Sequence, residues 1–169
     1  RLLMSHVKER EEVSHLFVEL IQGHETDILA GTESAGIPWA AWVSNEIEKP
    51  IIYVRKKTKD HGKENLIEGL LTEGQKVAVI EDLISTGGSS MNAVNAVRQA
   101  GGNVDLCYAI FTYEFDKSKR LFTEGDWRLS TLTDFSTLIK VAKTTGYINE
   151  EERELALRWN KNPEQWGRE

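Results

Sequence analysis

The chain has 169 residues and a formal net charge of -6, from 21 Lys and Arg against 27 Asp and Glu. This acidic balance argues against a general binder of nucleic acids or membrane surfaces, and no apolar run approaches the roughly 20 residues of a membrane span. The single cysteine excludes an internal disulfide and a multi-cysteine zinc site, and it suits a reducing compartment. A chain of this length predicts one domain.

The first half of the chain alternates between helical and extended patterns. Apolar residues recur at helical spacing between Val13 and Ile21, with Ser5 as the candidate N-cap. The elements predicted after this helix are a strand at 27–30 that ends at Gly31, a helix that begins near Pro38, a strand at 50–54 and a weaker strand at 66–71. This order is typical of an α/β protein.

The second half begins with an uninterrupted apolar strand, Val77-Ala78-Val79-Ile80, which predicts burial on both faces, as in a parallel sheet. The elements predicted after it are a helix that stops at 101–102, a strand at 104–112, a short helix at 117–122, a strand at 127–132 and two polar helices. The sequence therefore predicts an α/β fold with a mainly parallel central sheet flanked by helices. Ligands bind at the carboxyl ends of such strands, so the loops after Ala30, Val54 and Ile80 are the expected ligand-binding loops.

Two carboxylates and a hydroxyl-rich glycine turn follow the buried strand. Glu81 and Asp82 precede Ser85-Thr86-Gly87-Gly88-Ser89, which opens the next helix. Glycines let the backbone approach a ligand closely, and N–H groups at a helix N-terminus bind phosphate. The carboxylates are able to accept hydrogen bonds from sugar hydroxyls, so a ligand with both a phosphate and a polyol would account for the whole segment. The segment is neither a Walker A loop nor a dinucleotide fingerprint, and its glycines alone favour an ordinary strand–turn–helix junction.

Two further polar segments follow predicted strands. The run Arg55-Lys56-Lys57-Thr58-Lys59-Asp60-His61-Gly62-Lys63 is strongly basic and suits a multiply charged anion such as pyrophosphate. In isolation, a run of this kind is more often solvated surface or a nucleic-acid patch. The segment Gly31-Thr32-Glu33-Ser34-Ala35-Gly36-Ile37-Pro38 joins a strand to a helix and is, by itself, a weak glycine turn.

Other residues with chemical potential are better explained by packing or by a surface position. Three histidines lack metal-ligand spacing and are predicted to lie on the surface: His6, His15 and His24. Cys107 lies in an apolar strand and is predicted to be a buried small hydrophobe. Five tryptophans follow no base-stacking pattern and are predicted to pack in the core or at an interface: Trp39, Trp42, Trp127, Trp159 and Trp166.

Residues 77–89 resemble the thirteen-residue phosphoribosyl pyrophosphate (PRPP) motif of the type I phosphoribosyltransferases, in the form typical of bacterial orotate phosphoribosyltransferases. The basic segment is similar to the mobile catalytic loop of that family, Arg-x-x-x-Lys-x-His-Gly. The segment at 31–38 is similar to the short pyrophosphate loop of the family. The resemblance runs along nearly the whole chain, and it implies the type I phosphoribosyltransferase fold over residues 1–169, with most of the N-terminal hood segment of the family missing.

The resemblance also implies roles for particular residues. It assigns catalysis to Lys59, with Arg55 and His61 beside it, and it places Ser85 against orotate. It implies PRPP binding by Arg55, Lys56, Lys59, His61, Glu81, Asp82, Leu83, Ile84, Ser85, Thr86, Gly87, Gly88 and Ser89. It implies a pyrophosphate loop formed by Thr32, Glu33, Ser34, Ala35 and Gly36. Some orotate enzymes carry a Lys at the position of Ala35 and an Arg near Tyr113; this chain has neither, so no base contact is carried over to those positions.

The implied activity is transfer of the phosphoribosyl group from PRPP to orotate, which yields orotidine 5′-phosphate and pyrophosphate in pyrimidine nucleotide synthesis. The resemblance implies Mg²⁺ held through PRPP rather than by a protein metal site. It also implies a cytoplasmic homodimer in which the loop at 55–65 serves the neighbouring subunit, with no nucleic-acid or membrane partner. Two alternatives stay open: a purine or uracil phosphoribosyltransferase, and a PRPP-binding regulator without catalysis.

Overall fold

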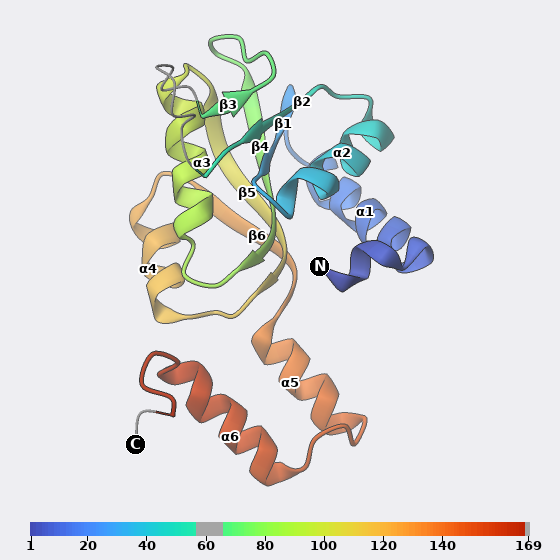
Figure 1. The fold of residues 1–169 in the computed structure, drawn as a ribbon, viewed down its shortest axis with the longest axis vertical. Helices are drawn as coiled ribbons and strands as arrows, with labels where there is room; N and C mark the ends of the chain where they lie inside the picture. The colour runs from blue at the N-terminus through green and yellow to red at the C-terminus, as the bar shows by residue number, and fades with distance from the viewer. Residues whose placement is uncertain (57–65, 168–169) are drawn as a thin grey trace.

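A six-stranded sheet forms the centre of the molecule, which the computed structural model describes for residues 1–56 and 66–167 (Figure 1). Its strand order is β3-β2-β1-β4-β5-β6. The strands are β1 Ile28–Thr32, β2 Ile51–Val54, β3 Ile67–Glu68, β4 Lys76–Ile84, β5 Asn103–Thr112 and β6 Arg128–Asp134. Only β3 runs antiparallel to its neighbour, so the prediction of a mainly parallel sheet in an α/β fold is confirmed for the described residues.

Helices cover both faces of this sheet. The helical elements are the 3-10 helix η1 Leu2–Ser5 and the α-helices α1 Val7–Gln22, α2 Gly36–Ile47, α3 Gly88–Gln99, α4 Asp116–Glu124, α5 Phe135–Thr144 and α6 Glu150–Lys161. Figure 1 shows α1 and α2 on one side of the sheet and α3 and α4 on the other. Helices α5 and α6 form a hairpin that extends beyond the end of β6. Among the described residues, none of the helices is both long and apolar enough to cross a membrane.

The apolar run in β4 is buried from both sides, as its lack of alternation predicts. Val77 and Val79 belong to the core that packs under α3, whereas Ala78 and Ile80 belong to the core under α1 and α2. Cys107 on the neighbouring strand is fully buried, and this burial raises the pKa of its thiol to about 12. The cysteine is therefore the inert core residue that the sequence predicts.

Four predicted boundaries need correction. Ser5 belongs to η1, and α1 starts after His6 without a side-chain cap. The strand expected at 66–71 is reduced to the two residues of β3. The first strand continues through Thr32 rather than ending before Gly31. Strand β4 continues to Ile84, because its ladder with β5 runs on to the Ile84–Thr112 pair. The acidic pair therefore lies inside a strand, and the ligand-binding loop begins at residue 85 rather than after residue 80.

Candidate active site

The loops that follow β1 and β4 lie next to each other because these two strands are paired neighbours. Gly31 pairs with Ile80 across the β1–β4 ladder. The buried hydroxyl of Thr32 donates a hydrogen bond of 3.2 Å to the backbone carbonyl of Ile80. The structure therefore brings the 31–36 loop and the 85–89 turn to the same edge of the sheet, as the carboxyl ends of parallel strands require.

The 31–36 loop is packed so tightly that it depends on glycine. A Cβ on Gly31 would lie 2.7 Å from the Cα of Ile37. A Cβ on Gly36 would overlap the carbonyl oxygen of Ile80 and the hydroxyl of Thr32. Both glycines let α2 begin directly against the backbone of β1 and β4. The 33–34 peptide bond within the loop is cis.

Glu33 ties this loop to the beginning of the basic segment. Its N–H donates to the carbonyl of Val54 at 2.9 Å, and its Oε2 accepts the N–H of Lys56 at 2.7 Å. Arg55 lies between Val54 and Lys56 in the chain, and its Nη1 is 3.8 Å from an oxygen of Glu68. Residues 55 and 56, which begin the basic segment, therefore lie next to the 31–36 loop.

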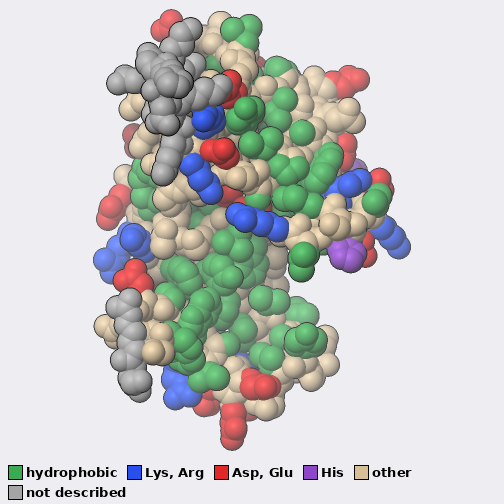
Figure 2. Space-filling view, viewed as in Figure 1, with side chains coloured by type: hydrophobic (Ala, Val, Ile, Leu, Met, Phe, Trp, Pro, Cys, Tyr) green, Lys and Arg blue, Asp and Glu red, His purple; other side chains and the backbone are tan. Residues whose placement is uncertain are grey.

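Lys59 and His61 lie outside the described residues, as does the rest of the segment at 57–65. Their assigned roles stay predictions. Figure 2 shows several Lys and Arg side chains across the middle of this face, with Asp and Glu side chains between them and hydrophobic side chains below them.

Glu81 is buried between the two loops. Only 4% of its surface is exposed, and its Oε2 accepts a hydrogen bond of 2.8 Å from the hydroxyl of Ser89. Its Oε1 accepts the N–H of Asp82 at 3.1 Å. Burial raises the pKa of the Glu81 carboxyl above its ordinary value, although hydrogen bonding by the hydroxyls of Thr32 and Ser89 acts in the opposite direction. Asp82 is less buried than Glu81, so its carboxylate is the more accessible of the pair.

The 85–89 turn leads directly into α3. Gly87 has a φ of 81° and occupies the N-cap position, which favours glycine because an L side chain is strained there. Gly88 is the first residue of α3 and is exposed; a Cβ on it would meet only the hydroxyl oxygen of Thr86, at 4.0 Å. The first N–H groups of a helix have no intrahelical acceptor. The turn therefore offers free backbone donors at a positive helix terminus, which suits a phosphate group.

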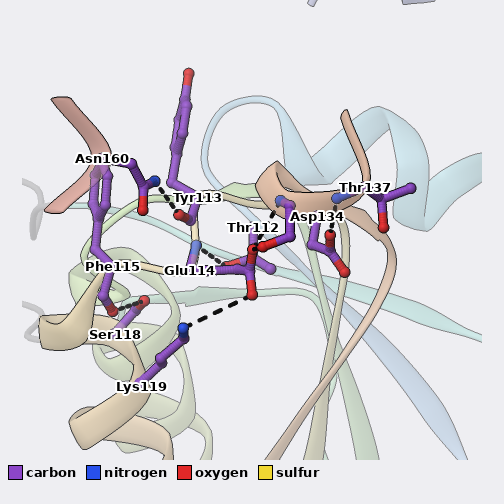
Figure 3. A network of polar contacts seen from close by, with 10 residues as sticks. Thr112, Tyr113, Glu114, Phe115, Ser118, Lys119, Asp134, Thr137 and Asn160 are labelled. Carbon is purple, nitrogen blue, oxygen red and sulfur yellow. Dashed lines mark hydrogen bonds and ion pairs between the residues drawn. The ribbon is translucent and has the colours of Figure 1, made fainter. Parts of the chain in front are cut away.

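A polar network at the carboxyl end of β5 was not predicted as part of the site (Figure 3). The N–H of Tyr113 donates to the carbonyl of Ile84 at 2.9 Å, immediately before the 85–89 turn. Glu114 has a φ of 57°, and its carboxylate accepts the N–H of Ser136 at 2.9 Å. Asn160 donates to the carbonyl of Tyr113 at 2.7 Å. From the sequence, Tyr113 was named only as the position near which some orotate enzymes carry an Arg, and residues 111–114 had no assigned function.

The remaining histidine and tryptophan candidates lie either at the surface or in packed parts of the protein. His6, His15 and His24 are exposed, as predicted. Within residues 1–56 and 66–167, no three His, Cys, Asp or Glu side chains converge as metal ligands. Trp39 and Trp127 are buried in the two cores. The other tryptophans are less buried: Trp42 stacks edge-on against Trp39, Trp159 joins an aromatic cluster with residues 113, 115 and 135, and Trp166 is 48% exposed.

Comparison with known proteins assigns most of this chain to one domain family. A sequence profile described as the phosphoribosyl transferase domain matches residues 5–141. An orotate phosphoribosyltransferase from Listeria innocua is 49% identical over 99% of this chain and 81% of its own length. Another, from Coxiella burnetii, is 44% identical over 98% of this chain and 80% of its own length.

Solved structures agree with the fold. The orotate phosphoribosyltransferase of Aeropyrum pernix superimposes with a TM-score of 0.75 at 23% identity, covering 87% of this chain and 81% of its own. That of Mycobacterium tuberculosis in complex with PRPP superimposes with a TM-score of 0.67 at 26% identity, covering 78% of this chain and 76% of its own. The expected type I phosphoribosyltransferase fold is confirmed. With sequence identity, coverage and fold in agreement, the chain belongs to the orotate phosphoribosyltransferase family.

Proposed function

We propose that this chain transfers the phosphoribosyl group of PRPP to orotate, forming orotidine 5′-phosphate and releasing pyrophosphate for pyrimidine nucleotide synthesis. The observation that carries the proposal is the juxtaposition of the acidic pair 81–82 and the 85–89 turn with the 31–36 loop. It supports the proposal because two carboxylates, which are able to accept hydrogen bonds from sugar hydroxyls, lie at the same edge of the sheet as N–H groups that are able to bind a phosphate. The 49% identity to an orotate phosphoribosyltransferase supports the choice of substrates.

The 85–89 turn binds the 5′-phosphate of PRPP through the open N–H groups at the start of α3. Asp82, the more accessible of the two acids, accepts hydrogen bonds from the ribose hydroxyls, with Glu81 behind it. The pyrophosphate lies between the 31–36 loop and the basic segment that begins at Arg55 and Lys56. Ser85, at the start of the turn, lies toward orotate.

The reaction is a displacement at C1 of the ribose. The bond from C1 to the pyrophosphate oxygen breaks and the pair of electrons leaves with pyrophosphate, while a ring nitrogen of orotate forms the new bond to C1 and loses its proton to solvent. The transition state resembles an oxocarbenium ion, and the mechanism uses no covalent nucleophile on the protein. Catalysis therefore comes from positioning and from cations aimed at the charge that develops on the leaving group, with Lys59 as the main group and Arg55 and His61 beside it.

We also propose Mg²⁺ as the cofactor. Mg²⁺ is commonly held by one or two carboxylates together with substrate phosphates rather than by a cage of protein ligands. Asp82 fits that arrangement, because its carboxylate is accessible beside the proposed PRPP site. When bound with PRPP, Mg²⁺ would neutralise charge on the departing pyrophosphate.

A direct assay tests the activity. Purified chain is incubated with PRPP, Mg²⁺ and either orotate, uracil, adenine or hypoxanthine, and release of pyrophosphate is measured for each base. We expect turnover with orotate well above that with the other three. Preference for another base would contradict the choice of orotate, and nucleic-acid binding without any turnover of PRPP would indicate a regulator instead.

Lys59→Ala tests the assigned catalytic cation. Removing one preorganised group that stabilises developing charge costs about 100-fold in kcat, and PRPP affinity should change much less. Lys63→Ala is the matched control, because it removes the same charge from the same basic segment at a position to which the family pattern assigns no contact. Equal turnover in Lys59→Ala and the parent chain would contradict the assigned function.

We further propose a cytoplasmic homodimer in which residues 55–65 of one protomer act at the site of its partner. Mixing the impaired Lys59→Ala protein with Asp82→Asn protein tests this arrangement, because a mixed dimer contains one site with both native groups. Recovery of activity that neither variant has alone supports sharing between subunits. No recovery, with exchange of subunits verified by mass spectrometry, would contradict it.

A further inference from the structure

Helix α6 contacts the loop that leaves β5 through the side chain of Asn160. Asn160 is part-buried near the end of the helix, and its Nδ2 donates a hydrogen bond of 2.7 Å to the carbonyl of Tyr113 (Figure 3). The two residues are 47 positions apart in the sequence. Next to this bond, the ring of Trp159 packs against the rings of Tyr113 and Phe115, with centroid distances of 5.6 and 5.7 Å. This end of α6 is therefore fixed to the loop that leaves β5.

Tyr113, whose carbonyl Asn160 holds, is itself hydrogen-bonded to the last residue of β4, next to the 85–89 turn. The N–H of Tyr113 donates to the carbonyl of Ile84 at 2.9 Å, and this carbonyl belongs to the peptide that leads into Ser85. Tyr113 thus accepts from α6 on one side and donates to the end of β4 on the other. A displacement of Tyr113 would move the backbone at the start of the 85–89 turn.

The ring of Tyr113 is held by aromatic packing, but its backbone depends on the polar contacts of the loop. Glu114 is a non-glycine residue with a φ of 57°, in the left-handed region that favours glycine. It is held by its N–H bond to the hydroxyl of Thr112 at 3.1 Å and by the bond of its carboxylate to Ser136. These contacts fix residue 114, whereas the carbonyl of Tyr113 receives its side-chain bond from Asn160.

We propose that Asn160 is a positioning residue of the phosphoribosyl site, acting through Tyr113 and Ile84 on the 85–89 turn. The inference rests on the proposed function, because the turn is taken to bind the 5′-phosphate of PRPP. Asn160 itself touches neither substrate nor reacting atoms in this scheme. Its amide holds the Tyr113 carbonyl, so that the free N–H groups of the turn face the phosphate without rearrangement.

Asn160→Asp isolates the hydrogen bond, since the side chain keeps its shape but an ionised carboxylate is unable to donate. Asn162→Asp is the matched control: it lies two residues further on, and its Nδ2 bonds only to Gln165, at 2.7 Å, among the described residues. Both substitutions add one negative charge and remove one amide donor. Asn160→Gln restores a donor and should recover part of any loss.

Two readouts separate positioning from a merely structural effect. The first is hydrogen exchange of the Tyr113 amide, with the NMR shifts of the amides at 85–89, in the substrate-free protein. The second is steady-state kinetics with PRPP. We expect Asn160→Asp to speed Tyr113 exchange and to raise the KM for PRPP, each about fivefold, as a lost hydrogen bond of ordinary strength implies. kcat should stay within about twofold, and Asn162→Asp should behave as the parent.

Unchanged exchange and shifts in Asn160→Asp, or altered exchange with an unchanged KM, would overturn the proposal. A loss of thermal stability with KM unchanged would likewise assign Asn160 a structural function only. If the parent chain fails to turn over PRPP, the proposed function fails. In that case the amide shifts at 85–89 still decide whether Asn160 positions the turn.

Discussion

The two loops proposed to bind the substrate each contain two glycines, which meet different requirements. Packing or a positive φ requires three of them, whereas neither applies to Gly88. In the 31–36 loop, added side-chain atoms would collide with the backbone of β4 and α2. In the 85–89 turn, Gly87 supplies a positive φ and Gly88 faces open space. The first pair of glycines allows the protein to fold, whereas Gly88 leaves room for a ligand. A glycine-rich loop at a substrate site is therefore not evidence, by itself, that each glycine serves binding.

The buried carboxylate of Glu81 connects these two regions. It lies one residue beyond Ile80, whose carbonyl accepts the Thr32 hydroxyl, and it accepts the hydroxyl of Ser89 from the far side. A buried carboxylate is costly unless it is hydrogen-bonded. A substitution in either loop is therefore expected to alter the surroundings of the Glu81 carboxylate.

Gly36→Ala should have the largest effect on stability, because it inserts a methyl group against the Ile80 carbonyl and the Thr32 hydroxyl. Ile80 is fully buried, so the strand has little freedom to move away. We expect a loss of about 3 kcal/mol in the free energy of unfolding, measured by urea denaturation. Gly23→Ala is the control, since a Cβ there meets nothing within 4 Å. Similar stability in the two variants would contradict the folding role of Gly36.

Ser89→Ala should come next, because it leaves Glu81 Oε2 without its hydroxyl donor. Loss of a hydrogen bond to a charged, buried group costs about 2 kcal/mol. The same substitution in a Glu81→Gln background should cost less, about 1 kcal/mol, since the remaining partner is neutral. A double-mutant cycle of urea midpoints measures the difference. Equal costs in the two backgrounds would show that the two loops are not coupled through this carboxylate.

The pH dependence of stability gives a third test. Burial raises the pKa of Glu81 above its ordinary value of 4.5, so the folded state holds the proton more tightly than the unfolded state. This contribution to stability is fully present below pH 4.5 and is lost as the pH rises through the pKa of the folded protein. Glu81→Gln removes it, so the stability of the variant relative to the parent should increase as the pH rises. A relative stability that stays constant with pH would argue against a buried, titrating Glu81.

Gly88→Ala should have the smallest effect on stability and a clear effect on binding. Its φ is not in the left-handed region and its Cβ direction is open, so stability should change by no more than about 1 kcal/mol, with a gain expected. The added methyl group would occupy the face that the phosphate approaches, and we expect the Kd for PRPP to rise about tenfold. Calorimetry measures this binding. Unchanged PRPP affinity would mean that the open face at Gly88 is not where the phosphate binds.

Much of the candidate site was predictable because its chemistry is local in the sequence. The apolar run from Val77 to Ile80 predicted a doubly buried strand, and the 85–89 turn was predicted to open a helix; both are confirmed. The extension of β4 through Glu81 and Asp82 was missed, because acidic residues resemble the start of a loop. It forms because the ladder with β5 continues and Ser89 satisfies the Glu81 carboxylate. The functions of Lys59, His61, Mg²⁺ and the dimer stay predictions.

The sequence by itself determined the order of helices and strands, the parallel sheet and the choice of loops proposed to bind the substrate, because each depends on hydrophobic periodicity or on a short contiguous motif. Only the tertiary structure decided which glycine is required for packing, which acid of the pair is buried, and that Asn160 reaches Tyr113. These features depend on atoms brought together from distant segments. No local pattern encodes the distance between Gly36 in α2 and the carbonyl of Ile80 on β4. The same holds for the contact of α6 with a loop 47 residues earlier in the chain.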